Sequence, residues 1–168
     1  APLLAFTAKE IWLEMPHRAG DDGRHVMLND MVQPNPQWVY APGEEEHWDR
    51  VLALRSEVLK AREQARAEKI VGKPLDAEIT LSLSDEAADR MHFLSAHHLE
   101  ALFIVSRVTV VRGPGPGLES AEFPGLHIQV QASQAPKCAR CWTHSDSVGT
   151  DSAHPDLCSR CAAVLGGR

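Results

Sequence analysis

The chain has 168 residues with 43% hydrophobic content, which is enough to build a buried core. Its formal net charge of −6 excludes a protein that is basic over its whole surface, so contact with nucleic acid would have to come from local patches. No apolar run reaches the ~18 residues that a membrane span needs, and the opening APLLAFTAKEIW lacks the features of a signal peptide. We therefore expect a cytoplasmic protein with no membrane contact. The first residue is Ala1 and not methionine, which fits a processed protein or a piece of a longer one.

The amino-terminal segment predicts one short helix. Thr7 and Glu10 have the spacing of a capping box, which would start a helix at Thr7. Pro16 disfavours helical geometry at the residue before it and should end that helix. Residues 18–43 are interrupted by prolines and glycines, and they predict an extended connection with at most a short strand at residues 26–28.

The strongest helical pattern covers residues 44–71. Three glutamates at residues 44–46 suit the positive end of the helix dipole, and Gly72 and Pro74 should stop the helix. Apolar residues recur three and four positions apart. They predict one buried stripe, formed by Val51, Leu54, Val58, Ala61 and Ala65.

Two strands with a helix between them are expected next. Residues 75–83 alternate between apolar and polar side chains, which predicts a strand with one wet face. Ser84 should cap a helix that reaches about Leu99, and the β-branched run at residues 102–111 predicts a buried strand. If the two strands are parallel, this β-α-β unit should be right-handed.

A glycine- and proline-rich break separates this unit from the rest of the chain. The stretch GPGPG at residues 113–117 would not be tolerated in a helix or a central strand, and residues 126–130 predict a third strand after it. The expected fold class is therefore α+β. A long helix and a small β-α-β-β sheet unit occupy residues 44–133, and a four-cysteine zinc knuckle or ribbon module occupies residues 134–168.

All four cysteines of the chain fall into two Cys-x2-Cys pairs separated by sixteen residues; they are Cys138, Cys141, Cys158 and Cys161. Two such knuckles can direct four thiolates to the corners of a tetrahedron, a geometry and a ligand type that suit one Zn²⁺ ion. A closed set of four ligands makes the metal structural and not catalytic. Free or disulfide-linked thiols are the alternative, which a reducing cytosol disfavours. His144 and His154 could replace a cysteine but are expected to be ordinary loop residues.

Trp142 directly follows the first cysteine pair. It could pack over the metal site, or it could offer a stacking platform for an unpaired base. In the second interpretation, cations on either side of it would meet phosphates; these are Lys137, Arg140 and Arg160.

A second group of basic residues follows the predicted long helix: Arg55, Arg62, Arg66, Lys69 and Lys73. Their spacings of seven, four, three and four keep them within a narrow stripe of an ideal helix. A solvated charged face is the commoner explanation of such a pattern. Few acidic partners lie on this stripe, however, so a phosphate backbone is the functional alternative.

Three stretches of the sequence resemble bacterial isoleucyl-tRNA synthetases. KCARCW followed by VGTDSAHPDLCSRC is similar to their C-terminal zinc motif, and WDRVLALRSEVLKAREQARAEKIVGKPLDAEITL is similar to the helix and strand before it. APLLAFTAKEIW is similar to the last part of their helical anticodon-binding domain. The resemblance implies a remnant of that domain at residues 1–17, an extended connection at 18–43, a junction domain at 44–133 and a zinc-binding module at 134–168.

The resemblance further implies the carboxyl end of a larger, monomeric class I enzyme, an isoleucine-tRNA ligase that uses ATP. The HIGH and KMSKS motifs of the catalytic domain are absent, so we expect no catalytic residue here. The implied role is to contact the anticodon stem-loop of tRNA(Ile), together with the remaining domains of the synthetase, and to support aminoacylation by the full enzyme. The four cysteines match the family's zinc ligands, and Arg140 and Trp142 occupy its Arg-Cys-Trp positions near tRNA.

Two other classes of protein are compatible with the cysteine pattern. A DNA glycosylase of the formamidopyrimidine type has a similar four-cysteine finger, but its proline-glutamate start is absent from APLL at residues 1–4. A structural zinc module for protein assembly is the other alternative, which the net acidic charge keeps open.

Overall fold

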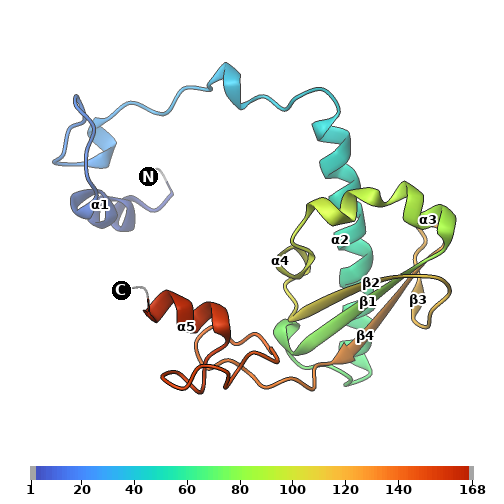
Figure 1. Ribbon diagram of the computed structural model, residues 1–168. Coiled ribbons are helices and arrows are strands. Elements are labelled where there is room, and N and C mark those ends of the chain that lie inside the picture. The colour runs from blue at the N-terminus through green and yellow to red at the C-terminus, as the bar shows by residue number, and fades with distance from the viewer. Residues whose placement is uncertain (1–2, 167–168) are drawn as a thin grey trace. The chain divides into compact units, whose positions relative to one another are not determined.

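The computed structural model describes residues 3–166, and the chain divides into two compact units, Ala1–Pro42 and Gly43–Arg168 (Figure 1). In the part that is described, no helix is both long and apolar enough to cross a membrane.

The first unit contains helix α1 (Ala5–Glu14) and two single-turn 3-10 helices, Val26–Leu28 and Pro36–Trp38. Helix α1 begins before Thr7 and has no side-chain capping bond, so the predicted capping box is wrong. The predicted end is confirmed, because Met15 is extended in front of Pro16. The expected strand at residues 26–28 is wrong: these residues form a 3-10 turn, in which His25 Nδ1 accepts a hydrogen bond from the Met27 N–H. Among its described residues, this unit buries none.

The second unit is built around a long helix and a four-stranded sheet. Its elements are α2 (Glu44–Ala67), a 3-10 turn (Pro74–Asp76), β1 (Ala77–Leu83), α3 (Asp85–Arg90), a 3-10 helix (His92–Ala96), α4 (Leu99–Phe103), β2 (Arg107–Arg112), β3 (Leu118–Glu119), β4 (Leu126–Ala132) and α5 (Ser159–Gly166). The expected α+β class is confirmed.

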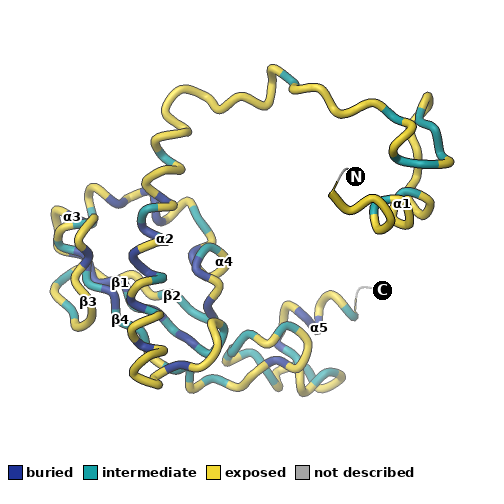
Figure 2. The backbone as a smooth tube through the Cα atoms, turned by 180° about the vertical axis from the view of Figure 1, so that it is seen from behind, coloured by how far each residue is buried: buried dark blue, intermediate teal, exposed yellow. Residues whose placement is uncertain are grey.

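Helix α2 packs against the sheet through the stripe that the sequence predicts. All five apolar residues of the stripe are buried, and they share one core with β1 and β4 (Figure 2). The helix ends at Ala67, earlier than expected. Lys69 adopts a left-handed conformation with φ of 61°, and the Ile70 N–H bonds the Ala65 carbonyl, which is the pattern of a Schellman motif.

The sheet has the strand order β2-β1-β4-β3, with β1 parallel to β2 and antiparallel to β4. The expected β-α-β unit and the later strand at residues 126–130 are confirmed as β1, α3, β2 and β4, but the short strand β3 between β2 and β4 was not predicted. The buried strand expected at residues 102–111 is wrong in two respects. Its first two residues belong to α4, where Phe103 is buried, and β2 is an edge strand with mostly exposed side chains.

The helix between β1 and β2 is also shorter than expected. Ser84 caps α3 as predicted, since its Oγ accepts a hydrogen bond from the Ala87 N–H at 3.2 Å. The helix then breaks at Met91 and continues as the 3-10 helix and α4. α3, the 3-10 helix and α4 together replace the one helix expected. Phe93, Leu94 and Phe103 on the last two of them are buried in the same core.

The GPGPG loop at residues 113–117 packs against the sheet. A Cβ atom at Gly115 would overlap the side chain of Ser82 on β1, and one at Gly117 would overlap the Ile128 carbonyl on β4. Gly117 also has a φ of 118°, which only glycine adopts without strain. These glycines let the loop lie directly on the strands, so they serve the packing of the sheet.

Candidate metal centre and its surroundings

The structure brings the four cysteines together at one point. Their sulfur atoms all lie within 4.8 Å of one another, and three of the four residues are buried. The Cys141 and Cys158 sulfurs are 3.8 Å apart, far too distant for a disulfide bond. Zn–S bonds of about 2.3 Å in a tetrahedron place sulfurs about 3.8 Å apart, so the cluster fits a structural zinc ion.

The protein environment also suits thiolates. Burial is the largest effect on Cys141 and raises its pKa, but hydrogen bonds from the Thr143 backbone and hydroxyl outweigh it and lower the pKa to about 6. Burial raises the pKa of Cys158 to about 11. Four sulfurs this close cannot all ionise without a cation among them, which is the charge that Zn²⁺ would supply.

Two arginines lie against the sulfur cluster. Arg140 Nη1 donates to the Cys161 sulfur at 3.6 Å. Arg160 donates to the Cys141 sulfur, and this bond raises the pKa of the Arg160 guanidinium. A zinc ion with four thiolates carries two negative charges, and these two cations offset them. Both arginines remain exposed, so each could also meet a phosphate.

Trp142 is largely exposed to solvent. Its exposed fraction is 64%, and its φ of 64° lies in the left-handed region that a bulky residue rarely adopts. The Trp142 N–H bonds the Cys138 carbonyl, so the turn around the metal site holds this conformation. An indole with this exposure is accessible to a ligand, which is what the stacking alternative requires.

The zinc module is fastened to the sheet by polar contacts that the sequence did not predict. Asp76, just before β1, lies 3.5 Å from the Lys137 ammonium and 3.4 Å from His144 Nε2. Ser106, just before β2, accepts a bond from the His144 N–H at 2.8 Å. Lys137 thus has a carboxylate partner within the chain. No sequence pattern signals these contacts, because each joins segments more than thirty residues apart.

The basic residues of the α2 stripe fall into two groups. Arg55 Nε donates to the Leu102 carbonyl at 3.0 Å, and Arg62 Nη1 donates to the Phe103 carbonyl at 3.1 Å. Both carbonyls lie at the end of α4, so these two arginines cap that helix. The other three are exposed: Arg66 pairs with Glu63 at 2.8 Å, and Lys69 and Lys73 lie beyond the helix end, where its periodicity no longer places them on one stripe.

The first prediction follows from this division. Replacing Arg62 by Gln should lower the free energy of unfolding by about 1–2 kcal/mol, because a half-buried charged donor is lost from the end of α4. Replacing Arg66 by Gln should change it by less than about 0.5 kcal/mol, since its ion pair is exposed. Urea unfolding of the two variants checks this difference. Equal stabilities would show that the carbonyl contact contributes nothing.

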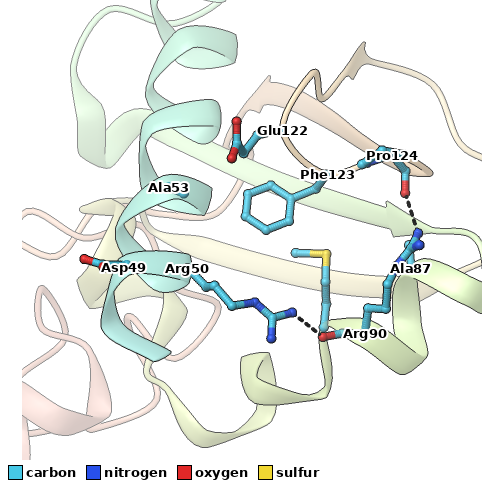
Figure 3. A pocket seen from close by; sticks show the side chains of 9 residues that line it. Asp49, Arg50, Ala53, Ala87, Arg90, Glu122, Phe123 and Pro124 are labelled. Atoms are coloured by element: carbon cyan, nitrogen blue, oxygen red, sulfur yellow. Dashed lines mark hydrogen bonds between the residues drawn. The ribbon is translucent and has the colours of Figure 1, made fainter. Parts of the chain in front are cut away.

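A cavity of about 420 Å³ lies between α2, α3 and the loop before β4 (Figure 3). The Arg50 guanidinium reaches the Arg90 carbonyl at 2.7 Å, and the Arg90 guanidinium reaches the Pro124 carbonyl at 3.2 Å. Asp49 and Glu122 also line this cavity, so its charges are balanced. Arg50 ties α2 to α3, and Arg90 ties α3 to the loop, so both arginines have a structural role.

The zinc site and the rest of the chain are similar in sequence to known proteins. Residues 136–164 match the zinc finger found in FPG and IleRS. The chain is 41% identical over 165 residues to isoleucine–tRNA ligase of Syntrophotalea carbinolica, covering 98% of this chain and 17% of that enzyme. Identity to the enzyme of Geobacter sulfurreducens is 40% over 168 residues, with the same two coverages, and to that of Moorella thermoacetica 38% over 171 residues, covering 98% and 18%.

The zinc finger by itself does not separate a glycosylase from a synthetase, since its family includes both. The relatives do, because they match the chain from the first unit through the zinc module. The chain spans less than a fifth of the length of these relatives. It is therefore homologous to isoleucine–tRNA ligases over nearly its whole length, and it matches a C-terminal fragment of these enzymes that carries the zinc finger of FPG and IleRS.

Proposed function

We propose that this chain is the tRNA-binding end of a cytoplasmic, monomeric isoleucine–tRNA ligase and contacts the anticodon stem-loop of tRNA(Ile). The observation that carries the proposal is the exposed Trp142, held by the turn around a closed four-cysteine centre. RNA-binding proteins commonly recognise unpaired loop bases by stacking them on such side chains. The relatives, which are named isoleucine–tRNA ligases, support the identity of the RNA.

In this proposal the zinc ion has a supporting role. Cys138, Cys141, Cys158 and Cys161 would hold one Zn²⁺, which folds the loops that present Trp142. Lys137, Arg140 and Arg160 are exposed beside it and would meet phosphates. Among the basic residues of α2 and its C-terminal end, the exposed Arg66, Lys69 and Lys73 are the better RNA candidates, because Arg55 and Arg62 already bond carbonyls.

The proposal also assigns the parts of the chain. Residues 1–17 would belong to the helical anticodon-binding domain of the whole enzyme, 18–43 to an extended connection, 44–133 to a junction domain and 134–168 to the zinc module. Unit Ala1–Pro42 has exposed Leu4 and Phe6 and no buried described residue, which fits a segment completed by other domains. Catalysis of aminoacylation would reside in those other domains.

The test is a titration of the zinc-loaded chain with the tRNA(Ile) anticodon stem-loop at fixed salt. We expect tighter binding to this stem-loop than to an unrelated hairpin of equal length, because unpaired bases would be recognised as well as phosphates. Equal affinity for both hairpins at matched salt would contradict anticodon recognition by this chain.

Replacing Trp142 by Ala separates stacking from folding. The affinity for the stem-loop should fall by roughly 5- to 100-fold, corresponding to about 1–3 kcal/mol for one stacked base. The zinc content should stay at one ion per chain, because the four candidate ligands are cysteines and Trp142 is exposed. Replacing the exposed Val164 of α5 by Ala is the matched control and should change neither quantity.

A further inference from the structure

A small polar cavity lies between β2 and the zinc module. It encloses about 210 Å³, and its wall carries the guanidinium groups of Arg107 and Arg160 together with serine and threonine hydroxyls. No carboxylate is among the residues that line it. Cys158 also lines the cavity, and its charge as a thiolate would be shared with the zinc ion. In a chain with a net charge of −6, a cavity lined by two arginines and by no aspartate or glutamate is a local exception.

The hydroxyl groups of this wall come from the zinc module. Ser145, Ser147 and Ser159 are joined to one another, with the Ser145 and Ser147 Oγ atoms 2.8 Å apart and the Ser159 N–H bonded to Ser147 Oγ at 3.1 Å. Serine hydroxyls can rotate to donate to an incoming anion. Arginine and hydroxyl donors around a space of this size form the type of lining that receives a phosphate group.

Both arginines already have partners: Arg160 donates to the Cys141 sulfur, and Arg107 lies against two carboxylates. Arg107 Nη2 bonds the Asp146 carboxylate, and its Nη1 lies 3.8 Å from Glu78. The Asp146 side chain is 74% exposed, so this contact is a surface ion pair of small net free energy. Glu78 is mostly buried and is held by Ser133 Oγ at 2.7 Å, so it stays in place. Asp146 is therefore the partner that another anion can displace.

The larger cavity of Figure 3 provides a contrast. It also contains two arginines, but Asp49 and Glu122 line it, and both guanidiniums bond backbone carbonyls. An anion there would meet two carboxylates. The cavity beside β2 lacks such groups in its lining, and one of its arginines is paired only with carboxylates outside that lining.

We propose that the cavity between β2 and the zinc module binds one phosphate group of an RNA backbone, with Arg107 and Arg160 as its cationic partners. The phosphate replaces Asp146 as the partner of Arg107. Thr143 lines the cavity and directly follows Trp142 in the chain, so a nucleotide stacked on Trp142 has its backbone near this cavity. The RNA assignment rests on the proposed function, whereas the phosphate site does not.

The first experiment titrates the zinc-loaded chain with inorganic phosphate and follows its amide chemical shifts. We expect saturable shifts at residues 143–147 and 159–160. Replacing Arg107 by Gln should weaken phosphate binding at least tenfold, and replacing Asp146 by Asn should strengthen it severalfold, because the competing carboxylate is gone. A gain of affinity cannot result from a folding defect, so the Asp146 variant tests the site even if the Arg107 variant fails to fold.

Arg112 is the matched control, because it lies on the same strand and is paired with Asp85 and Asp89. Its replacement by Gln should leave phosphate binding unchanged. If phosphate produces no saturable shift, or if the Arg107 and Asp146 variants bind it as the wild type does, the site is overturned. Unchanged zinc content in all variants excludes an effect through the metal.

The stem-loop RNA separates the two possible sources of the phosphate. Replacing Arg107 by Gln should reduce the slope of log affinity against log salt by about 0.7–0.9, the contribution of one phosphate. If RNA binds with an unchanged slope, the inference is overturned and the proposed function stands. If RNA does not bind while phosphate still shows the expected variant pattern, the RNA assignment is overturned and a site for free phosphate remains.

Discussion

Replacing Cys161 by Ser is expected to abolish stoichiometric zinc binding and to unfold residues 134–166 while the sheet core stays folded. Cys161 is fully buried, and the only other buried members of its cluster are Cys138 and Cys158 among the described residues. So small an apolar cluster cannot stabilise thirty residues of loop, whereas a structural zinc site contributes about 10–16 kcal/mol of binding free energy. The loss of this binding free energy should therefore unfold the zinc module.

Zinc analysis and amide hydrogen exchange measure this outcome. Protection of Ala139, Trp142 and Leu157 should be lost, and protection of Ile79 and Leu81 in β1 should persist, because the two cores share no residue. His154 lies between the cysteine pairs outside the sulfur cluster, so replacing it by Gln should preserve one zinc ion. A serine variant that still binds one zinc ion with normal protection would contradict a four-thiolate structural centre.

Replacing Glu57 by Gln is expected to lower the free energy of unfolding by about 2–3 kcal/mol at pH 7. Glu57 is 4% exposed on the face of α2 that packs on the sheet. Its carboxylate accepts bonds from Lys60, from Ser120 Oγ at 2.7 Å and from the Ala121 N–H at 3.0 Å. Glu57 bonds the loop before β4 directly to α2, and a neutral amide would bind these donors less strongly.

The stabilisation by Glu57 is also expected to depend on pH. The hydrogen bond from Lys60 is the largest effect, and with the Ser120 hydroxyl it outweighs burial and lowers the pKa of Glu57 from 4.5 to about 2. A lowered pKa stabilises the fold above about pH 4.5, and this stabilisation is lost as the pH falls from 4.5 to 2. A fall in the pKa from 4.5 to about 2 corresponds to about 3 kcal/mol of stability.

Urea unfolding at several pH values between 7 and 3 provides the measurement. The difference between the wild type and the Glu57 variant should be largest at pH 7 and should shrink below pH 4.5. Replacing Glu63 by Gln on the same helix is the control, because Glu63 is 55% exposed and should cost less than about 0.5 kcal/mol. A difference that stays constant with pH would show that the charge of Glu57 is not involved.

The sequence alone determined the features that depend on local period and spacing. The stripe of α2 was predicted residue by residue, because a helix buries positions three and four apart whatever it packs against. The strand β1, the Ser84 cap and the break at residues 113–117 were found for the same reason. The wet face expected for β1 was wrong, because no residue of the strand is exposed and Ser82 is buried under Gly115. The Cys-x2-Cys spacing likewise predicted a zinc site before any fold was known, since four soft ligands have few other uses.

Only the tertiary structure decided which of these features face solvent and which partners they meet. The β-branched run of β2 suits a buried strand, yet the strand order places β2 at the edge. Glu57 carries the same charge as its exposed neighbours, and only the return of residues 120–121 to α2 makes it a buried anchor.

The basic residues show the same limit. Arg55 and Arg62 were indistinguishable in sequence from the exposed Arg66, but the end of α4 provides carbonyls for the first two alone. The sequence pattern around Arg107 predicts only a strand, whereas the fold places Arg107 with Arg160 in the lining of one cavity. Local sequence pattern predicts the secondary structure of a residue and the interactions that its side chain is able to make. Contacts between distant segments determine which of these interactions form, because they set the burial and the hydrogen-bond partners of the side chain.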